Sequence, residues 1–367
     1  MATPDLFTPM KLGNIELKNR MVMAPMTRNR ANPEGNVPQD MNVTYYRQRA
    51  SAGLIITEAT QISPQGVGYP LTPGIYSSEQ LEGWRKINNA VHEEGGKIIA
   101  QLWFCGRISH PSLLPDNQQP VSASAIRPAG DAFTMEGLKP FETPRELSTD
   151  EIEDIIGQYR HAADLAKQAG FDGIEVHAAN GYLIDQFLRD GSNHRTDGYG
   201  GSVENRMRFL NEVMDAVCEI WDSASVGVRL SPENPFNDMS DSDPQTHFEY
   251  FASELSARGL AYLHLIEGGM GSDEPKTVDY HAIRAAFKGN YMANLGFTKE
   301  QANRAIADGD CDLVSFGVPF LANPDLVYRF EHDLPLNEVD MDTFYGGDEK
   351  GYTDYPFAEQ QQAKAAV

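Results

Sequence analysis

The sequence predicts an α/β fold in the form of a single (β/α)8 TIM barrel. A short apolar strand, a loop and an amphipathic helix follow one another eight times along the 367 residues. Such alternation is typical of a parallel sheet, and eight right-handed units in one chain close most economically into a barrel. An open doubly wound sheet is the alternative, but the GxGxxG motif expected after its first strand is missing.

The first half of the chain contains four predicted strands. They span residues 19–26, 53–59, 97–103 and 171–176. A helix over 39–52 follows the first strand. Two more helices begin at Ser77 and Ser148, because each serine has Gln or Glu three residues later, which is the spacing of a capping box.

The second half repeats the same unit. The predicted strands are 225–230, 261–267, 290–295 and 312–317, and the predicted helices are 203–221, 244–258, 278–287 and 298–308. Ser202 is the expected N-cap of the first of these helices. A last helix begins within the segment 323–330.

Two segments depart from the repeat. Residues 104–147 are rich in proline and polar residues and too long for an ordinary connection, so we expect a capping segment over the barrel mouth with a short hairpin. Residues 337–367 follow the last helix and are expected to fold back over the barrel. The whole chain, 1–367, is therefore interpreted as one domain.

Composition excludes several classes of function. The formal net charge of −23 repels phosphate backbones and acidic membranes, so neither nucleic acid nor a membrane is an expected partner. No apolar run approaches the ~20 residues of a membrane-spanning helix, and the first residues lack a signal-peptide pattern, so a cytoplasmic location is expected. Three widely spaced cysteines argue against disulfides, iron–sulfur clusters and structural zinc.

In a TIM barrel the active site lies at the C-terminal ends of the strands. The residues expected there are Pro25, Thr27, Ala59, Gln101, Trp103, His177, Asn180, Arg229, Gly268, Asn294, Gly296 and Gly317. They offer hydrogen bonds to a planar ligand with polar edges, and they contain neither a metal-binding cluster nor a Schiff-base lysine. The glycines after strands seven and eight suit a phosphate, so flavin mononucleotide (FMN) is the candidate ligand.

Simpler interpretations stay open at this point. His177 and Asn180 could be a structural pair that fixes a turn, and Arg229 could form an ordinary salt bridge. The chain could also be a barrel lyase or hydrolase without flavin, or a flavin-binding protein with little turnover. The missing metal cluster and lysine argue against the first of these two functions.

Eight motifs in a fixed order resemble one family. They are MAPMTRNR, TEATQIS, QLWFCGR, HAANGYLIDQFL, RTDGYGGSVENR, VGVRLSP, FGVPFLANPDL and the C-terminal FYGG…GYTDYP. Nearly the whole chain resembles the Old Yellow Enzyme family of flavin-dependent ene-reductases, and within it the bacterial reductases of N-ethylmaleimide and nitrate esters. The resemblance implies non-covalent FMN, NADPH or NADH as hydride donor, a ping-pong reaction on activated alkenes, and a monomer or homodimer.

The resemblance also implies roles for individual residues. Around the flavin, Thr27 would bond the C4 carbonyl, Pro25 and Ala59 would pack along the ring, Gln101 would bond the pyrimidine edge, and Arg229 would lie near N1 and O2. Asn294, Gly296, Gly317 and position 318 would hold the phosphate. His177 and Asn180 would bind the substrate oxygen, Tyr182 would protonate the α-carbon after hydride reaches the β-carbon, and Tyr69, Trp103 and Tyr345 would surround the substrate.

One position departs from the family pattern. Val318 stands where family members usually have arginine after the glycine of FG. A charge-assisted hydrogen bond is worth about 1.5–3 kcal/mol, so FMN is expected to bind roughly 10- to 100-fold less tightly than with arginine there.

Overall fold

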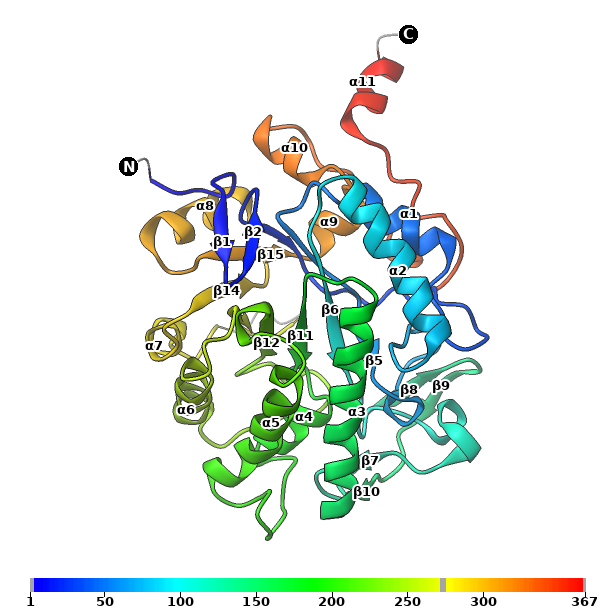
Figure 1. Ribbon diagram of the computed structural model, residues 1–367, viewed down its shortest axis with the longest axis vertical. Helices are drawn as coiled ribbons and strands as arrows, with labels where there is room; N and C mark the ends of the chain where they lie inside the picture. The colour runs from blue at the N-terminus through cyan, green and yellow to red at the C-terminus, as the bar shows by residue number, and fades with distance from the viewer. Residues whose placement is uncertain (1–2, 271–274, 366–367) are drawn as a thin grey trace.

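The computed structural model describes residues 3–270 and 275–365 and contains a closed parallel barrel (Figure 1). Its strands are β3 (Met21–Met23), β4 (Leu54–Ile56), β6 (Ile98–Trp103), β11 (Gly173–His177), β12 (Val226–Leu230), β13 (Tyr262–Ile266), β14 (Asn290–Asn294) and β15 (Leu313–Phe316). Each strand pairs in parallel with the next, and pairing of β15 with β3 closes the ring. The predicted TIM barrel is therefore confirmed. A two-residue strand, β5 (Thr60–Gln61), extends the sheet beside β6.

Helices follow the barrel strands and surround them (Figure 1). They are α1 (Asp40–Gln48), α2 (Ser78–Glu93), α3 (Thr149–Gln168), α5 (Val203–Cys218), α6 (Pro244–Ser256), α7 (Tyr280–Ala286), α8 (Lys299–Asp308) and α10 (Leu326–Glu331). The expected capping boxes at Ser77 and Ser148 are present, and Ser202 caps α5. Two short helices in the loops, α4 (Leu183–Leu188) and α9 (Val318–Ala322), were not predicted, because five or six residues carry no clear helical periodicity.

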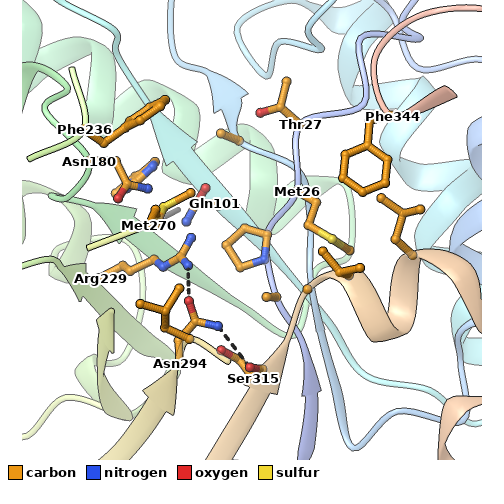
Figure 2. Close-up of a pocket in the computed structure, with 18 of the residues that line it drawn as sticks. Met26, Thr27, Gln101, Asn180, Arg229, Phe236, Met270, Asn294, Ser315 and Phe344 are labelled. Atoms are coloured by element: carbon orange, nitrogen blue, oxygen red, sulfur yellow. Dashed lines mark hydrogen bonds between the residues drawn. The ribbon is translucent and has the colours of Figure 1, made fainter. Parts of the chain in front are cut away.

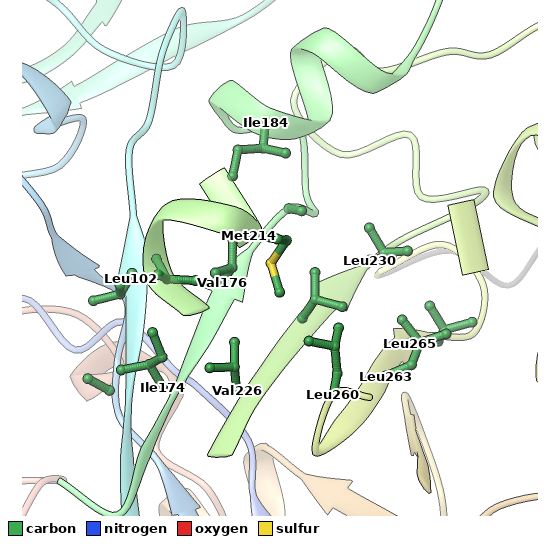
Figure 3. Packing of buried hydrophobic residues seen from close by; sticks show 14 of the residues in the cluster. Leu102, Ile174, Val176, Ile184, Met214, Val226, Leu230, Leu260, Leu263 and Leu265 are labelled. Carbon is green, nitrogen blue, oxygen red and sulfur yellow. The ribbon is translucent and has the colours of Figure 1, made fainter. Parts of the chain in front are cut away.

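The pleat of the strands separates two sets of side chains. Those that point outward pack against the helices. Figure 3 shows such a cluster, which contains Val176 of β11, Leu265 of β13 and Met214 of α5. The residues between them, such as Glu175 and His264, point into the barrel and bond across its interior. Because the outward side chains hold the barrel together, the inward positions near the strand ends can be occupied by polar residues that bind a ligand or act in catalysis.

An N-terminal hairpin closes the end of the barrel where the strands begin. Strands β1 (Met10–Leu12) and β2 (Ile15–Leu17) pair in antiparallel fashion and bury Leu12 and Leu17 against the first residues of the barrel strands. The sequence analysis missed this hairpin, because three residues per strand are too few for the alternating pattern to stand out.

The capping segment 104–147 contains the expected hairpin, formed by β8 (Asp131–Thr134) and β9 (Gly137–Pro140). The segment also holds two short parallel strands, β7 (Val121–Ser122) and β10 (Arg145–Glu146). Phe133 of β8 lines the cavity described below, so this hairpin reaches the barrel mouth as expected.

The C-terminal tail is held by arginines that follow β3. Arg28 donates to the carbonyls of Phe344 and Gly351 at 2.9 Å, and Arg30 donates to that of Thr343 at 2.9 Å. These contacts bring the tail to the barrel mouth. The last helix, α11 (Ala358–Ala365), projects away from the barrel (Figure 1). Among the described residues, no helix is long and apolar enough to cross a membrane.

Truncation of Leu265 tests the outward-facing core. Leu265 is fully buried, so Leu265→Ala should lower the free energy of unfolding by about 2–5 kcal/mol through lost burial and the resulting cavity. Leu138, which is 69% exposed on the capping hairpin, provides the control, and Leu138→Ala should change the value by less than about 0.5 kcal/mol. Urea unfolding of both variants measures the difference, and equal effects would contradict this account of the core.

Candidate active site

A cavity of about 850 Å³ opens at the C-terminal ends of the barrel strands (Figure 2). The sequence analysis placed sixteen residues at a functional site. Gly268, which follows β13, is not among the described residues that line the cavity, and the other fifteen are. They are Pro25, Thr27, Ala59, Tyr69, Gln101, Trp103, His177, Asn180, Tyr182, Arg229, Asn294, Gly296, Gly317, Val318 and Tyr345. Parallel strands that end on one side of the barrel explain why residues so far apart in the chain meet here.

Arg229 lies on one side of the cavity floor and is oriented by Asn294. Its Nη2 donates to Asn294 Oδ1 at 2.8 Å, and Asn294 Nδ2 donates to the Ser315 carbonyl at 3.0 Å (Figure 2). The Asn294 carboxamide is therefore already engaged at both ends. This arrangement favours a role for Asn294 in orienting Arg229, while its expected role at a phosphate stays a prediction.

A layer of polar side chains lies under the cavity. The Glu175 carboxylate accepts hydrogen bonds from Gln101 Nε2 at 2.7 Å, from Tyr262 Oη at 3.0 Å and from His264 Nδ1 at 2.8 Å. Burial opposes ionisation of Glu175, but His264, Arg229 and the hydrogen bonds hold its pKa below the ordinary value. Because Gln101 gives its amide N–H to Glu175, its carbonyl oxygen is left to accept from a ligand above.

His264 completes this layer as a neutral imidazole. Burial, helped by the charge of Arg229, lowers the pKa of His264 despite the attraction of Glu175. In the neutral form Nδ1–H donates to Glu175, and Nε2 accepts from the Ser315 hydroxyl at 2.8 Å. His264 is fully buried inside the barrel, in the interior layer of side chains.

Three buried nitrogens of the cavity lining lack a hydrogen-bond partner among the described residues. They are Trp103 Nε1, His177 Nδ1 and Arg229 Nε. The indole and guanidinium nitrogens can only donate, and buried donors without acceptors are costly, by about 1–3 kcal/mol each. The cavity is therefore suited to a ligand that presents several acceptors.

The turn after β11 presents Asn180 to the cavity. Asn180 and Gly181 both have positive φ angles, of 60° and 76°, and a Cβ at Gly181 would lie only 2.7 Å from the Met239 side chain. The Asn180 N–H donates to Ser231 Oγ at 2.8 Å, and the Gly181 N–H donates to Asp185 Oδ2 at 2.8 Å. Glycine and these two bonds fix the turn that the motif HAANGY encodes.

An aromatic wall forms the side of the cavity next to His177. The Tyr182 ring meets the rings of Trp103 and His177 edge to face, at centroid distances of 4.9 and 5.2 Å. The hydroxyls of Tyr182 and Tyr69 are 3.2 Å apart. Burial raises the pKa of Tyr182 well above its ordinary value and lowers that of His177 well below its own, so the phenol stays protonated and the imidazole stays neutral at pH 7.

The loops after β14 and β15 form the other side of the cavity. Leu295 has a φ of 103°, which is a strained conformation for leucine, and Gly296 follows with a φ of 73°. Val318, the departure from the family pattern, is 48% exposed at the start of α9. Arg229 is the only lysine or arginine among the described residues that line the cavity.

Sequence reasoning missed several residues of the site. Glu175 had a usable signal, because it lies two residues before His177 in the same strand and must point to the same side. Phe236, Met270 and Phe344 also line the cavity, but they come from irregular loops whose path no periodicity reveals.

One group of potential metal ligands, Asp190, Asp241 and His247, lies outside the cavity lining, and Arg206 Nη2 contacts the His247 ring at 3.1 Å.

Comparison with known proteins identifies the family. A family profile described as NADH:flavin oxidoreductase / NADH oxidase matches residues 5–337. The chain belongs to this family. The reductase is 46% identical to 12-oxophytodienoate reductase 1 of Oryza sativa subsp. japonica over 365 residues, which cover 98% of this chain and 94% of the rice protein.

Solved structures agree with this assignment. Morphinone reductase is 47% identical, with a TM-score of 0.94 over 98% of each chain. A structure of morphinone reductase in complex with tetrahydroNAD is 49% identical, with a TM-score of 0.92 over 96% of this chain and 98% of that one. The Old Yellow Enzyme homologue from Zymomonas mobilis is 44% identical, with a TM-score of 0.92 over 96% of this chain and 99% of that one.

The reductase is thus an FMN-dependent ene-reductase of the Old Yellow Enzyme type that uses NAD(P)H. The family decides against the barrel lyase or hydrolase and against a flavin binder without turnover. The cavity fits FMN, because Trp103 Nε1 and Arg229 Nε, which have no partner among the described residues, need acceptors, and an isoalloxazine ring with a bound substrate offers carbonyl oxygens and ring nitrogens.

Replacement of Val318 tests the phosphate end of the site. Val318→Arg adds a cation at the mouth of a cavity whose described lining has Arg229 as its only lysine or arginine, so FMN should bind roughly 10- to 100-fold more tightly. Titration of the apoprotein with FMN measures the change, and riboflavin, which lacks the phosphate, serves as the control ligand. If riboflavin gains as much affinity as FMN, the arginine does not act on the phosphate.

Proposed function

We propose that His177 and Asn180 of the reductase bind the activating oxygen of an alkene and that Tyr182 supplies the proton. The observation that carries the proposal is that three groups suited to these tasks line a single cavity, in which the His177 and Tyr182 rings meet edge to face. Thr27, Pro25, Ala59, Gln101 and Arg229 line the same cavity and would hold the flavin ring. When bound, FMN supplies the hydride that it has received from NAD(P)H.

Oxygen binding by His177 and Asn180 would polarise the alkene. A neutral imidazole has one N–H donor and a carboxamide has two, and both side chains are more than nine-tenths buried. Negative charge grows on the carbonyl or nitro oxygen as hydride reaches the β-carbon, and hydrogen bonds in a dry site stabilise that charge. His177 need not change protonation for this task, because its low pKa keeps it neutral.

Tyr182 would then protonate the α-carbon. A phenol with a raised pKa keeps its proton until a strong base is beside it, and a carbanionic α-carbon is such a base. Tyr69 lies 3.2 Å from the Tyr182 hydroxyl and Trp103 packs against its ring, so these two neighbours fix the direction of the phenol. Tyr345, which is 64% exposed, would contact the substrate at the rim.

The proposed substrates are small activated alkenes: enones, maleimides and nitroalkenes, with nitrate esters as a further class. The alkene and NAD(P)H would use the cavity in turn. A cytoplasmic location and a monomeric or homodimeric state stay predictions, and the free cysteines Cys105, Cys218 and Cys311 suit a reducing compartment.

Removal of the Tyr182 hydroxyl tests proton delivery. Tyr182→Phe should keep flavin and NAD(P)H oxidation but slow cyclohexenone reduction, by about 10²- to 10⁴-fold if general acid catalysis dominates. Stopped-flow mixing measures the two half-reactions separately, and the NAD(P)H half-reaction is the internal control. Unchanged enone reduction would remove Tyr182 from the mechanism.

Truncation of His177 tests oxygen binding. His177→Ala should weaken the binding of a para-substituted phenol by roughly 10-fold or more, because a hydrogen bond to its charged oxygen is lost. In the wild type the affinity should show no inflection near pH 6.5, since the pKa of His177 lies well below that value and the ring does not gain a proton there. An inflection near pH 6.5 that disappears in His177→Ala would show that the imidazole titrates.

A further inference from the structure

Asn234 is a fully buried asparagine directly behind Asn180, in the loop that follows β12. Its carboxamide is engaged at both ends. Asn234 Oδ1 accepts the backbone N–H of Phe236 at 3.3 Å and that of Met270 at 3.1 Å, and Asn234 Nδ2 donates to Asn180 Oδ1 at 2.8 Å. Phe236 and Met270 lie close to Asn180 at the cavity (Figure 2).

These bonds leave the Asn234 amide a single orientation. A backbone N–H can only donate, so the end of the amide that faces Phe236 and Met270 must be the carbonyl oxygen. The NH₂ end therefore faces Asn180 and requires an acceptor there. Asn180 Oδ1 is that acceptor, which turns the NH₂ group of Asn180 away from Asn234.

We propose that Asn234 is a positioning residue that makes Asn180 a hydrogen-bond donor toward the substrate. A free carboxamide can present either its oxygen or its NH₂ group, and the oxygen would repel the carbonyl or nitro oxygen of an alkene. Asn234 removes this ambiguity, because two backbone N–H groups fix its own polarity. The inference rests on the proposed role of Asn180 in oxygen binding.

The neighbouring asparagine shows that this role is specific. Asn237 Nδ2 donates to the Asn180 backbone carbonyl at 2.8 Å, so Asn237 holds the turn but leaves the side-chain amide free to rotate. Asn234 is the only described residue that bonds to the Asn180 side chain. Which end of the Asn180 side-chain amide faces the cavity thus depends on Asn234.

A double-mutant cycle tests the proposal. Asn234→Asp keeps the shape of the side chain but has no donor, so Asn180 must turn its NH₂ group toward the new carboxylate and its oxygen toward the cavity. The flavin-loaded wild type, Asn234→Asp, Asn180→Ala and the double variant are titrated with para-chlorophenol, followed by absorbance. Asn234→Asp should weaken phenol binding by about 10-fold or more in the wild type. In the Asn180→Ala background it should change binding by no more than about 2-fold, because only residues in contact show coupling.

The outcomes separate the two proposals. An equal loss from Asn234→Asp in both backgrounds would overturn the positioning role, because the new charge or a structural change would then act without Asn180. Unchanged phenol binding in Asn180→Ala alone would instead refute the proposed role of Asn180. Flavin content and thermal unfolding verify folding.

A second substitution covers a failure to fold. If Asn234→Asp does not fold, the same cycle is run with Asn234→Ala, which frees the Asn180 amide to rotate. A loss in the wild-type background that disappears in the Asn180→Ala background supports the positioning role, and an equal loss in both backgrounds overturns it.

Discussion

The structure depends on the alternation of side chains along eight parallel strands that close into a ring. Each outward residue packs against a helix and each inward residue must fit a shared interior, so neither set can move without the other. Since all the strands run the same way, their last inward residues gather at one end of the ring. Trp103, His177 and Arg229 meet there although long stretches of sequence separate them. The outward side chains of these strands, by packing against the helices, thus fix the positions of the inward side chains that form the site.

The interior changes character from one end to the other. Near the starts of the strands it is apolar, and the N-terminal hairpin adds Leu12 and Leu17 to it. In the middle Glu175 gathers Gln101, Tyr262 and His264 into a bonded layer. A buried carboxylate is tolerable only when donors surround it, and these donors are then held in fixed directions. The layer beneath the cavity is rigid for this reason, and it decides which end of the Gln101 amide faces a ligand.

A similar logic governs the upper part of the site. Arg229 is oriented by Asn294, and Asn180 is oriented by Asn234, whose own polarity comes from two backbone N–H groups. Within the described lining of the cavity, three buried nitrogens have no hydrogen-bond partner, and they belong to Trp103, His177 and Arg229. Other buried atoms without a partner, such as Arg107 Nε and Tyr159 Oη, lie away from the cavity, so the open space beside these three nitrogens is what suits them to a ligand. The family supplies the identity of the ligand, and the unpartnered donors give the physical reason that it binds.

The sequence by itself predicted the barrel, the order of its elements and, apart from Gly268, a set of residues that the structure brings to one cavity. The period of the apolar residues and the length of each apolar run distinguish strands from helices. Because the parallel strands of a barrel all end on one side, the residues at those ends can be assigned to one site. The tertiary structure decided what has no local signal. It revealed the N-terminal hairpin, the loop residues Phe236 and Met270, and the engagement of Asn294 with Arg229. It alone shows which end of the Asn180 amide faces the cavity, because that direction depends on a partner 54 residues away in the chain.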